Sequence, residues 1–224
     1  MAQFPRPLDR LVSIMNVLPI TTAEAKPWIM QKHYARRMPC VQYAFGLFDN
    51  RVLHGVVTFG QLASPTPARG VCGDVWQSHV VELNRLCVEH DSDNAASFLV
   101  GRAMRLLPRP MIVMSYADTA QGHIGYVYQA TNWFYTGLSN KARDPIIEGA
   151  EGSHNRHNHE RNGRVIGYVD RPRKHRYVYF CGTRKERKAM REALRYEVQP
   201  YPKGETRRYD ASAQFATQPL LFEC

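Results

Sequence analysis

Apolar runs of strand length recur along the chain between polar turns. They predict strands over residues 11–19, 43–48, 52–59, 80–88, 164–170 and 176–181, and one more that begins at Met111-Ile-Val-Met114. Strands 43–48 and 52–59 are joined by Asp49-Asn50-Arg51, a polar turn typical of a hairpin. The pattern therefore predicts a chain rich in short strands.

Helical spacing of apolar positions predicts helices between these strands. Three are expected, each with an N-cap: 23–31 after Thr22, 95–107 after Asn94 or Asp93, and a basic helix from Thr183 to about Tyr196. Residues 61–73, with two prolines, and the polar residues 146–164 are expected to be loops. This order predicts a mixed α/β sheet in which the strand before helix 95–107 and the strand after it form a parallel pair.

Composition narrows the class of protein. With 224 residues, 44% of them hydrophobic, the chain can bury a full core. It has no apolar run of membrane-spanning length, and its first residues lack the pattern of a secretion signal, so we expect a cytoplasmic protein without a membrane partner. The five cysteines are scattered without a CxxC pair, which argues against disulfides and against a thiolate zinc site.

The net charge of +10 is concentrated near the C-terminus. Residues 164–208 hold 14 Lys and Arg against five Asp and Glu, with tyrosines interleaved. Basic side chains neutralise phosphates and aromatic faces stack on unpaired bases, so this segment favours a nucleic-acid partner. A solvated basic helix face is the alternative.

The richest chemistry lies between Met111 and Gly137. The strand there ends in Ser115-Tyr116-Ala117-Asp118, and a polar turn leads to His123 and to a segment with Tyr126 and Tyr128. Polar groups at the carboxyl end of a strand are where open sheets commonly bind ligands. An aromatic core strand and helix with a polar loop between them is the alternative interpretation.

Three further groups are candidates for binding. The start of helix 95–107, with Asn94 and Ser97, offers free amides to an anion, although ordinary capping explains Asn94 equally well. His33-Tyr34 at a helix end is a candidate substrate contact or a structural pair. Three histidines in the 146–164 loop are a candidate metal site without a fixed scaffold: His154, His157 and His159.

Several motifs together resemble a known family. The element order and the pattern Tyr128-Gln-Ala-Thr-Asn-Trp-Phe resemble the GNAT acyltransferase fold. A more specific resemblance is to the Mom family of phage DNA-modification proteins. The motifs that carry it are HY at 33–34, ELNRL at 82–86, NAAS at 94–97, SYAD at 115–118, GHIGYVYQATNWFY at 122–135, HRYVYF at 175–180 and PYPKG at 200–204. The resemblance implies a GNAT-like catalytic core over 1–145, and a His-rich loop and basic, DNA-contacting extension of the same domain over 146–224.

The resemblance also implies an activity. Mom proteins convert adenine in DNA to N6-carbamoylmethyladenine, which shields phage DNA from host restriction. The implied partners are double-stranded DNA and an activated donor, in the cytoplasm of the host. Positions that match the family motifs are the functional candidates: His33, Tyr34, Arg85, Ser97, Asp118 and Tyr128.

The donor site departs from the acyltransferase pattern. The glycine-rich pyrophosphate loop is missing, because residues 89–97 read EHDSDNAAS, with two aspartates where a polyphosphate would be repelled. Acetyl-coenzyme A, another activated glycine-like donor and a metal ion all remain candidates as cofactors. Four residues are expected to hold the donor: Arg85, Ser97, Asn94 and Ser115.

Roles follow from the chemistry of an amine nucleophile. Asp118 is expected to take the proton, with His33 second, and Tyr128 to protonate the leaving group, while Tyr34 contacts the substrate. An ion pair of Arg85 with Asp118 or Glu82 that serves only structure is the alternative. Two other functions remain open: N-acetylation of a protein or small amine, and nucleic-acid binding without catalysis.

Overall fold

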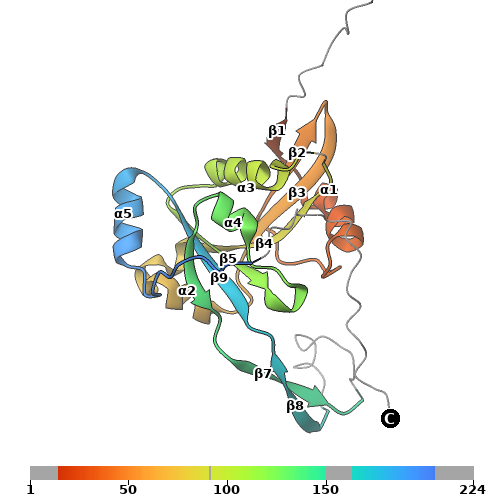
Figure 1. The fold of residues 1–224 in the computed structure, drawn as a ribbon, viewed down its shortest axis with the longest axis vertical. Helices are drawn as coiled ribbons and strands as arrows, with labels where there is room; N and C mark the ends of the chain where they lie inside the picture. Colours follow the sequence, from red (N-terminus) through yellow and green to blue (C-terminus); the bar gives the residue numbers. More distant parts are fainter. Residues whose placement is uncertain (1–14, 91, 150–162, 205–224) are drawn as a thin grey trace, which may run out of the picture.

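The computed structural model describes residues 15–90, 92–149 and 163–204. Its main sheet has the strand order β1-β2-β3-β4-β5-β9-β6 (Figure 1). The strands are β1 (Asn16–Pro19), β2 (Tyr43–Asp49), β3 (Val52–Gly60), β4 (Val80–Val88), β5 (Met111–Asp118), β6 (Phe134–Leu138) and β9 (Lys174–Cys181). Neighbouring strands are antiparallel except β4 and β5, which are parallel as predicted.

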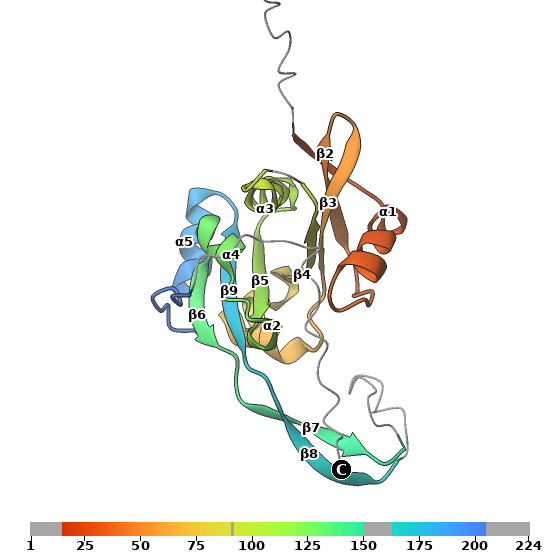
Figure 2. The same ribbon diagram turned by 45° about the vertical axis from the view of Figure 1, so that its right-hand side comes forward.

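Helices cover both faces of this sheet (Figure 2). They are α1 (Thr22–Pro27) with a π-helical turn (Trp28–Lys32), α2 (Pro65–Cys72), α3 (Ala95–Leu106), α4 (Tyr126–Ala130) and α5 (Arg184–Glu192), with 3₁₀ turns at Asp74–His79 and Thr119–Gln121. The predicted class, a mixed sheet flanked by helices, is confirmed.

Alternation along β5 separates two cores, because successive side chains of a strand point to opposite faces. Val113 packs with Leu99 of α3 in one apolar cluster, and Ile112 packs with Val71 of α2 and Met190 of α5 in another. A third, smaller cluster lies under α1. The sheet is thus held rigidly from both sides.

The parallel pair separates along its length, and this separation creates the site. Pairing of β4 with β5 runs only from Val80/Ile112 to Glu82/Met114. Beyond that point β4 continues against β3 alone, and β5 continues against β9. An opening between two strands of one sheet is the result.

A second, two-stranded sheet extends from the main one. β7 (Ala142–Ile147) and β8 (Val165–Arg171) pair antiparallel and lie beyond the ends of β6 and β9. Figures 1 and 2 both show this arm reaching away from the rest of the molecule. The domain boundary expected at residue 145 falls inside β7, and β9 from the C-terminal part lies within the main sheet.

Several predicted elements need correction. Residues 61–73 contain α2, because proline at the first helical position is compatible with a helix. The cap of α1 is Thr21, not Thr22: its hydroxyl accepts the Glu24 amide, and the Glu24 carboxylate accepts the Thr21 amide. The loop expected from residue 146 begins later, because β7 runs to Ile147, and α5 ends at Glu192, short of Tyr196.

Candidate active site

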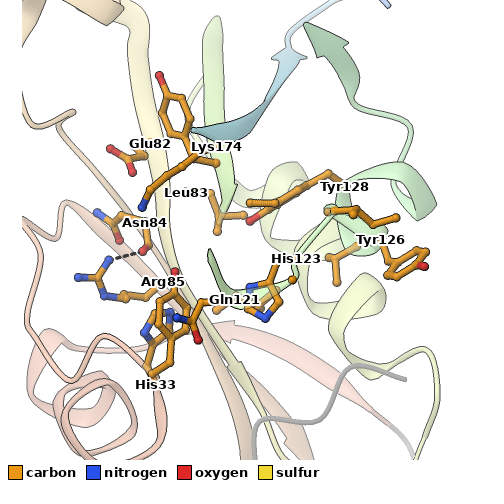
Figure 3. A pocket seen from close by; sticks show the side chains of 18 of the residues that line it. His33, Glu82, Leu83, Asn84, Arg85, Gln121, His123, Tyr126, Tyr128 and Lys174 are labelled. Carbon is orange, nitrogen blue, oxygen red and sulfur yellow. Dashed lines mark hydrogen bonds between the residues drawn. The ribbon is translucent and has the colours of Figure 1, made fainter. Parts of the chain in front are cut away.

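A cavity of about 650 Å³ lies where β4 and β5 separate (Figure 3). Residues 82–86 of β4 line one side, and residues 121–128, which run from the end of β5 into α4, line the other. His33 and Tyr34 close it from the segment after α1, and Lys174 from the start of β9. Segments far apart in the sequence therefore meet at one opening in the sheet.

Tyr128 presents its hydroxyl to this cavity from α4. Its ring packs between Trp133 and Tyr177, with ring centroids 5.0 and 5.1 Å away. Burial raises the pKa of Tyr128 to about 12, so the phenol is protonated at neutral pH. Its hydroxyl lies 2.8 Å from that of buried Ser115, which in turn lies 2.9 Å from the Leu83 carbonyl oxygen. Tyr128 is thus a fixed proton donor.

His33 and Tyr34 line the cavity. Their rings stack at 4.3 Å, and His123 meets Tyr34 edge-on at 5.7 Å. The His33 Nδ1 accepts the Ala35 amide, so the single ring hydrogen of neutral His33 is on Nε2. Burial, with Arg85 and His123 nearby, lowers the pKa of His33 to about 3. His33 is therefore a neutral hydrogen-bond donor, with neither ring nitrogen available as a base.

Arg85 lines the cavity but holds the chain in place. Its Nε and Nη2 donate to the Arg37 carbonyl oxygen at 3.2 and 3.0 Å. Its neighbour Asn84 donates to the Cys40 carbonyl oxygen and accepts from Thr58. Through these bonds β4 fixes the segment after α1, and with it His33, at the cavity wall.

Asp118 does not line the cavity itself but pairs with Lys174, which does. One carboxylate oxygen pairs with the Lys174 ammonium at 2.9 Å and the other accepts the Ala120 amide at 3.0 Å. Lys174 lines the cavity, and Asp118 does not.

Partial burial lowers the pKa of His123, which is neutral at pH 7, while the negative charge of Asp118 opposes that shift.

The two residues at the start of α3 lie apart from the cavity. Ser97 donates its hydroxyl to the Asn94 carbonyl oxygen, and the Asn94 side chain makes no capping bond. Neither lines the cavity, and Asp93 places a carboxylate beside this helix start. The residues present therefore do not fit a coenzyme pyrophosphate, and the structure does not bring Ser97 and Asn94 together with the other candidates. Ser115 lies beneath the cavity wall rather than in it.

Several polar residues at the cavity were not among the candidates named from the motifs, including Glu82, Asn84, Gln121, His123 and Lys174. Glu82 lines the wall together with Tyr116, whose pKa burial raises. The polar positions that interrupt the apolar pattern of β4 were the available signal for Glu82. No local pattern indicated Lys174, which lies 56 residues after Asp118 along the chain.

The described residues contain neither a metal-ligand cluster nor a membrane-spanning helix. Within the described ranges no group of three His, Cys, Asp or Glu side chains is placed to hold a metal ion. His154, His157 and His159 lie outside the described residues. No helix of the described part is long and apolar enough to cross a membrane.

Comparison with known proteins identifies the family. The model of the Mom protein family matches residues 14–203. The chain belongs to the Mom protein family. Its relative in Escherichia phage Mu, the methylcarbamoylase mom, is 31% identical over 199 aligned residues, and the match covers 80% of each chain. The family match over residues 14–203 includes every residue that lines the cavity except Gly204.

Solved structures similar to this Mom family protein include acetyltransferases. An N-acetyltransferase of a ribosomal-protein alanine from Escherichia coli is 8% identical and covers 76% of this chain and 96% of its own, with a TM-score of 0.45. An N-acetyltransferase from Staphylococcus aureus is 13% identical and covers 75% and 99%, with a TM-score of 0.43. Similarity at this level says nothing about a shared substrate.

Proposed function

We propose that this protein is a transferase that converts adenine in DNA to N6-carbamoylmethyladenine and so protects phage DNA from host restriction in the host cytoplasm. Membership of the Mom family and the similarity to the phage Mu methylcarbamoylase support this function. The observation that carries it is the cavity between β4 and β5, where a protonated phenol and a neutral imidazole face one space.

The transfer needs one proton acceptor and one proton donor. As the adenine amino nitrogen bonds to the donor carbon, the bond from that carbon to its leaving group breaks. The nitrogen then loses a proton, and the leaving group gains one. Tyr128 supplies the proton to the leaving group. His123 accepts the proton from nitrogen, because it faces the cavity uncharged, and Asp118 stabilises the resulting imidazolium at close range.

This assignment changes the role first expected for Asp118. Both of its carboxylate oxygens are engaged, by Lys174 and by the Ala120 amide, so it acts through charge rather than by direct proton transfer. His33 donates a hydrogen bond from Nε2 to a substrate acceptor. Tyr34, 37% exposed, offers a ring face at the cavity entrance.

Adenine must leave the duplex stack to reach such a cavity. Aromatic side chains that receive an extruded base are present: Tyr34, Tyr116 and Tyr126 all line the cavity. The volume of about 650 Å³ holds a purine together with a small donor. The donor is an activated two-carbon amide or glycine-like compound, because the start of α3 does not fit a coenzyme pyrophosphate.

The duplex lies along the arm formed by β7 and β8. In the arm and its root, residues 139–149 and 163–174, six basic residues face three acidic ones. A two-stranded ribbon fits the major groove of DNA, which is about 12 Å wide. The root is fixed beside the cavity, since the Ser139 amide donates to the Lys174 carbonyl and the Lys174 amide donates to the Ser139 hydroxyl.

Nucleoside mass spectrometry tests the function. DNA from cells that express the protein should contain an adenosine heavier by one carbamoylmethyl group, and DNA from cells expressing Tyr128→Phe should lack it. Acetylated protein without modified nucleoside would replace the proposal with an acetyltransferase. DNA binding without either product would replace it with a non-catalytic role.

A further inference from the structure

The hydroxyl pair of Ser115 and Tyr128 sits at the last point of contact between the two separating strands. The backbone pairing of β4 with β5 ends at Glu82/Met114. One residue later, the Ser115 side chain takes over and reaches the Leu83 carbonyl oxygen at 2.9 Å. Ser115 is 1% exposed, so its hydroxyl has no access to bulk water.

Ser115 has a single hydrogen for two acceptors. When it donates to the Leu83 carbonyl, the Tyr128 hydroxyl donates to Ser115 and its hydrogen is turned away from the cavity. When Ser115 donates to the Tyr128 oxygen instead, 2.8 Å away, the Tyr128 hydrogen is released toward the cavity. The two arrangements differ only by rotation of hydroxyl groups.

We propose that Ser115 is a positioning residue that turns the Tyr128 hydroxyl toward the cavity and stabilises the oxyanion formed when Tyr128 gives up its proton. This inference rests on the proposed function, in which Tyr128 is the acid. In the step, the Tyr128 O–H bond breaks, the proton goes to the departing group of the donor, and the electron pair stays on the phenolic oxygen. That oxygen accepts the Ser115 hydrogen, and a proton from water later restores the phenol.

Two observations support this role over donor binding by Ser115. Its hydroxyl lies beneath the cavity wall, with Leu83 and Tyr128 between it and the open space. The bond from Ser115 also lowers the pKa of Tyr128, against the larger upward effect of burial. A donor to the phenolic oxygen favours the charged form of that group.

The test uses paired variants of equal shape. Ser115→Thr keeps a hydroxyl and Ser115→Val replaces it with a methyl, so both carry the same overpacking. We expect Ser115→Val and Ser115→Ala to make about 10–100-fold less modified adenosine per folded protein than Ser115→Thr, which corresponds to one lost hydrogen bond to a charged group. Duplex DNA affinity should be the same in all three.

A control variant distinguishes a positioning role of Ser115 from an effect on folding stability alone. Thr136→Val removes another buried hydroxyl, on β6 and away from the cavity, which accepts from the Arg176 Nε and donates to the Arg176 carbonyl oxygen of β9. It should lower the melting temperature about as much as Ser115→Ala while leaving product per folded protein unchanged. With a carbon-13 label at the tyrosine Cζ, Ser115→Ala should shift the resonance that Tyr128→Phe removes, and Thr136→Val should not.

Two results would overturn the inference: product that falls only in proportion to the folded fraction, or a Tyr128 resonance that Ser115→Ala leaves in place. Failure of the proposed function is distinguishable. If Tyr128→Phe retains full product, the acid assignment itself is wrong, whatever Ser115 does. If Tyr128→Phe loses product and Ser115→Ala does not, only the role of Ser115 is wrong.

Discussion

The segments that flank the two ends of β9 are both basic, but they differ in how they pack on the rest of the molecule. At the Lys174 end, the arm leaves the sheet beside the cavity, and it exposes apolar side chains such as Ile166 (53%) and Tyr168 (62%). At the Cys181 end, the basic helix α5 is capped by Thr183 and packed on the sheet through buried Met190. Figure 1 shows α5 at the left side of the molecule, apart from the arm at the bottom.

Charge density alone therefore does not predict which of the two segments contacts DNA. Basic residues are spaced more densely on helix α5 than on the arm, and the features of α5 are those of a stable surface helix. The arm is a two-stranded ribbon of the kind that is only marginally stable alone, and its strand β8 ends three residues before Lys174 of the cavity wall. The comparison predicts that changes near Lys174 alter the reaction, and that changes near Cys181 alter mainly stability.

The largest effect is expected at Tyr128. Tyr128→Phe removes one hydroxyl and keeps the ring packed on Trp133 and Tyr177, so folding and DNA affinity should survive. Modified adenosine should fall by about 10²–10⁴-fold, the usual loss for a general acid.

Asp118→Asn should reduce the amount of modified adenosine less than Tyr128→Phe does, because it weakens the Lys174 pair and the stabilisation of His123 without removing a transferred proton. Mass spectrometry, melting temperature and DNA affinity on the same preparations check both variants; near-normal product from stable Tyr128→Phe would remove this tyrosine from the mechanism.

Charge reversal compares the two basic regions directly. Lys141, Arg143 and Arg164 are exposed on the arm, and Arg184, Lys185, Arg187 and Lys188 are exposed on α5. Reversing the three arm residues to Glu should flatten the salt dependence of duplex binding by about 0.9 log units per lost phosphate contact, and should cut product. Reversing the four on α5 should weaken affinity less, although it removes more charge. Fluorescence anisotropy with a labelled duplex at several salt concentrations measures both slopes. A steeper loss in the α5 variant would place the DNA at the other end of β9.

Much of this fold is readable from the sequence, and the exceptions have physical causes. Continuous apolar runs predicted β2, β3, β4, β5 and β9 of the main sheet, because a sheet covered on both faces needs apolar residues at every position. β7 was missed because Pro145 and Asp144 interrupt it, which an edge ribbon tolerates and a central strand does not. Helix α2 was missed because Pro65 reads as a loop residue unless its place at the helix start is known.

The site was only partly readable. Motif resemblance found His33, Tyr34, Arg85 and Tyr128, which line the cavity, but local sequence could not show where β4 and β5 separate. That separation decides which polar residues face open space. Ser115 lies beneath the cavity wall, and Ser97 bonds to the start of its own helix. Lys174, which follows the arm in the sequence, lines the cavity.

An acid-dependent loss of stability is expected at the cavity end through His33. Its pKa is about 3 in the folded protein and near 6.5 when unfolded, so between these values the unfolded chain binds a proton that the folded protein does not. Stability contributed by neutral His33 is therefore complete above pH 6.5 and falls as the pH drops toward 3, by at most about 1.4 kcal/mol per pH unit. His33→Asn keeps an acceptor for the Ala35 amide and cannot titrate. Urea unfolding at pH 7, 5 and 4 should show a shallower pH dependence for this variant; equal slopes would show that His33 is accessible to protons in the folded protein.

The smallest effect is expected at the other end of β9, from Thr183→Ala. The Thr183 hydroxyl accepts the Glu186 amide at 3.3 Å, and the Glu186 carboxylate accepts the Thr183 amide at 2.6 Å. This reciprocal cap matters because Arg184, Lys185 and Arg187 place positive charge at the helix end where the dipole is already positive. Loss of the cap should cost about 1 kcal/mol and lower the melting temperature by about 2–4 °C in a chain of this size. Thr183→Ser, which keeps the hydroxyl, should restore most of that loss. Product per folded protein should not change in either variant, since Met190 still anchors α5 and no group at the cavity touches this cap. A drop in product beyond the drop in folded protein would show that α5 takes part in the reaction, and the contrast between the two ends of β9 would then fail.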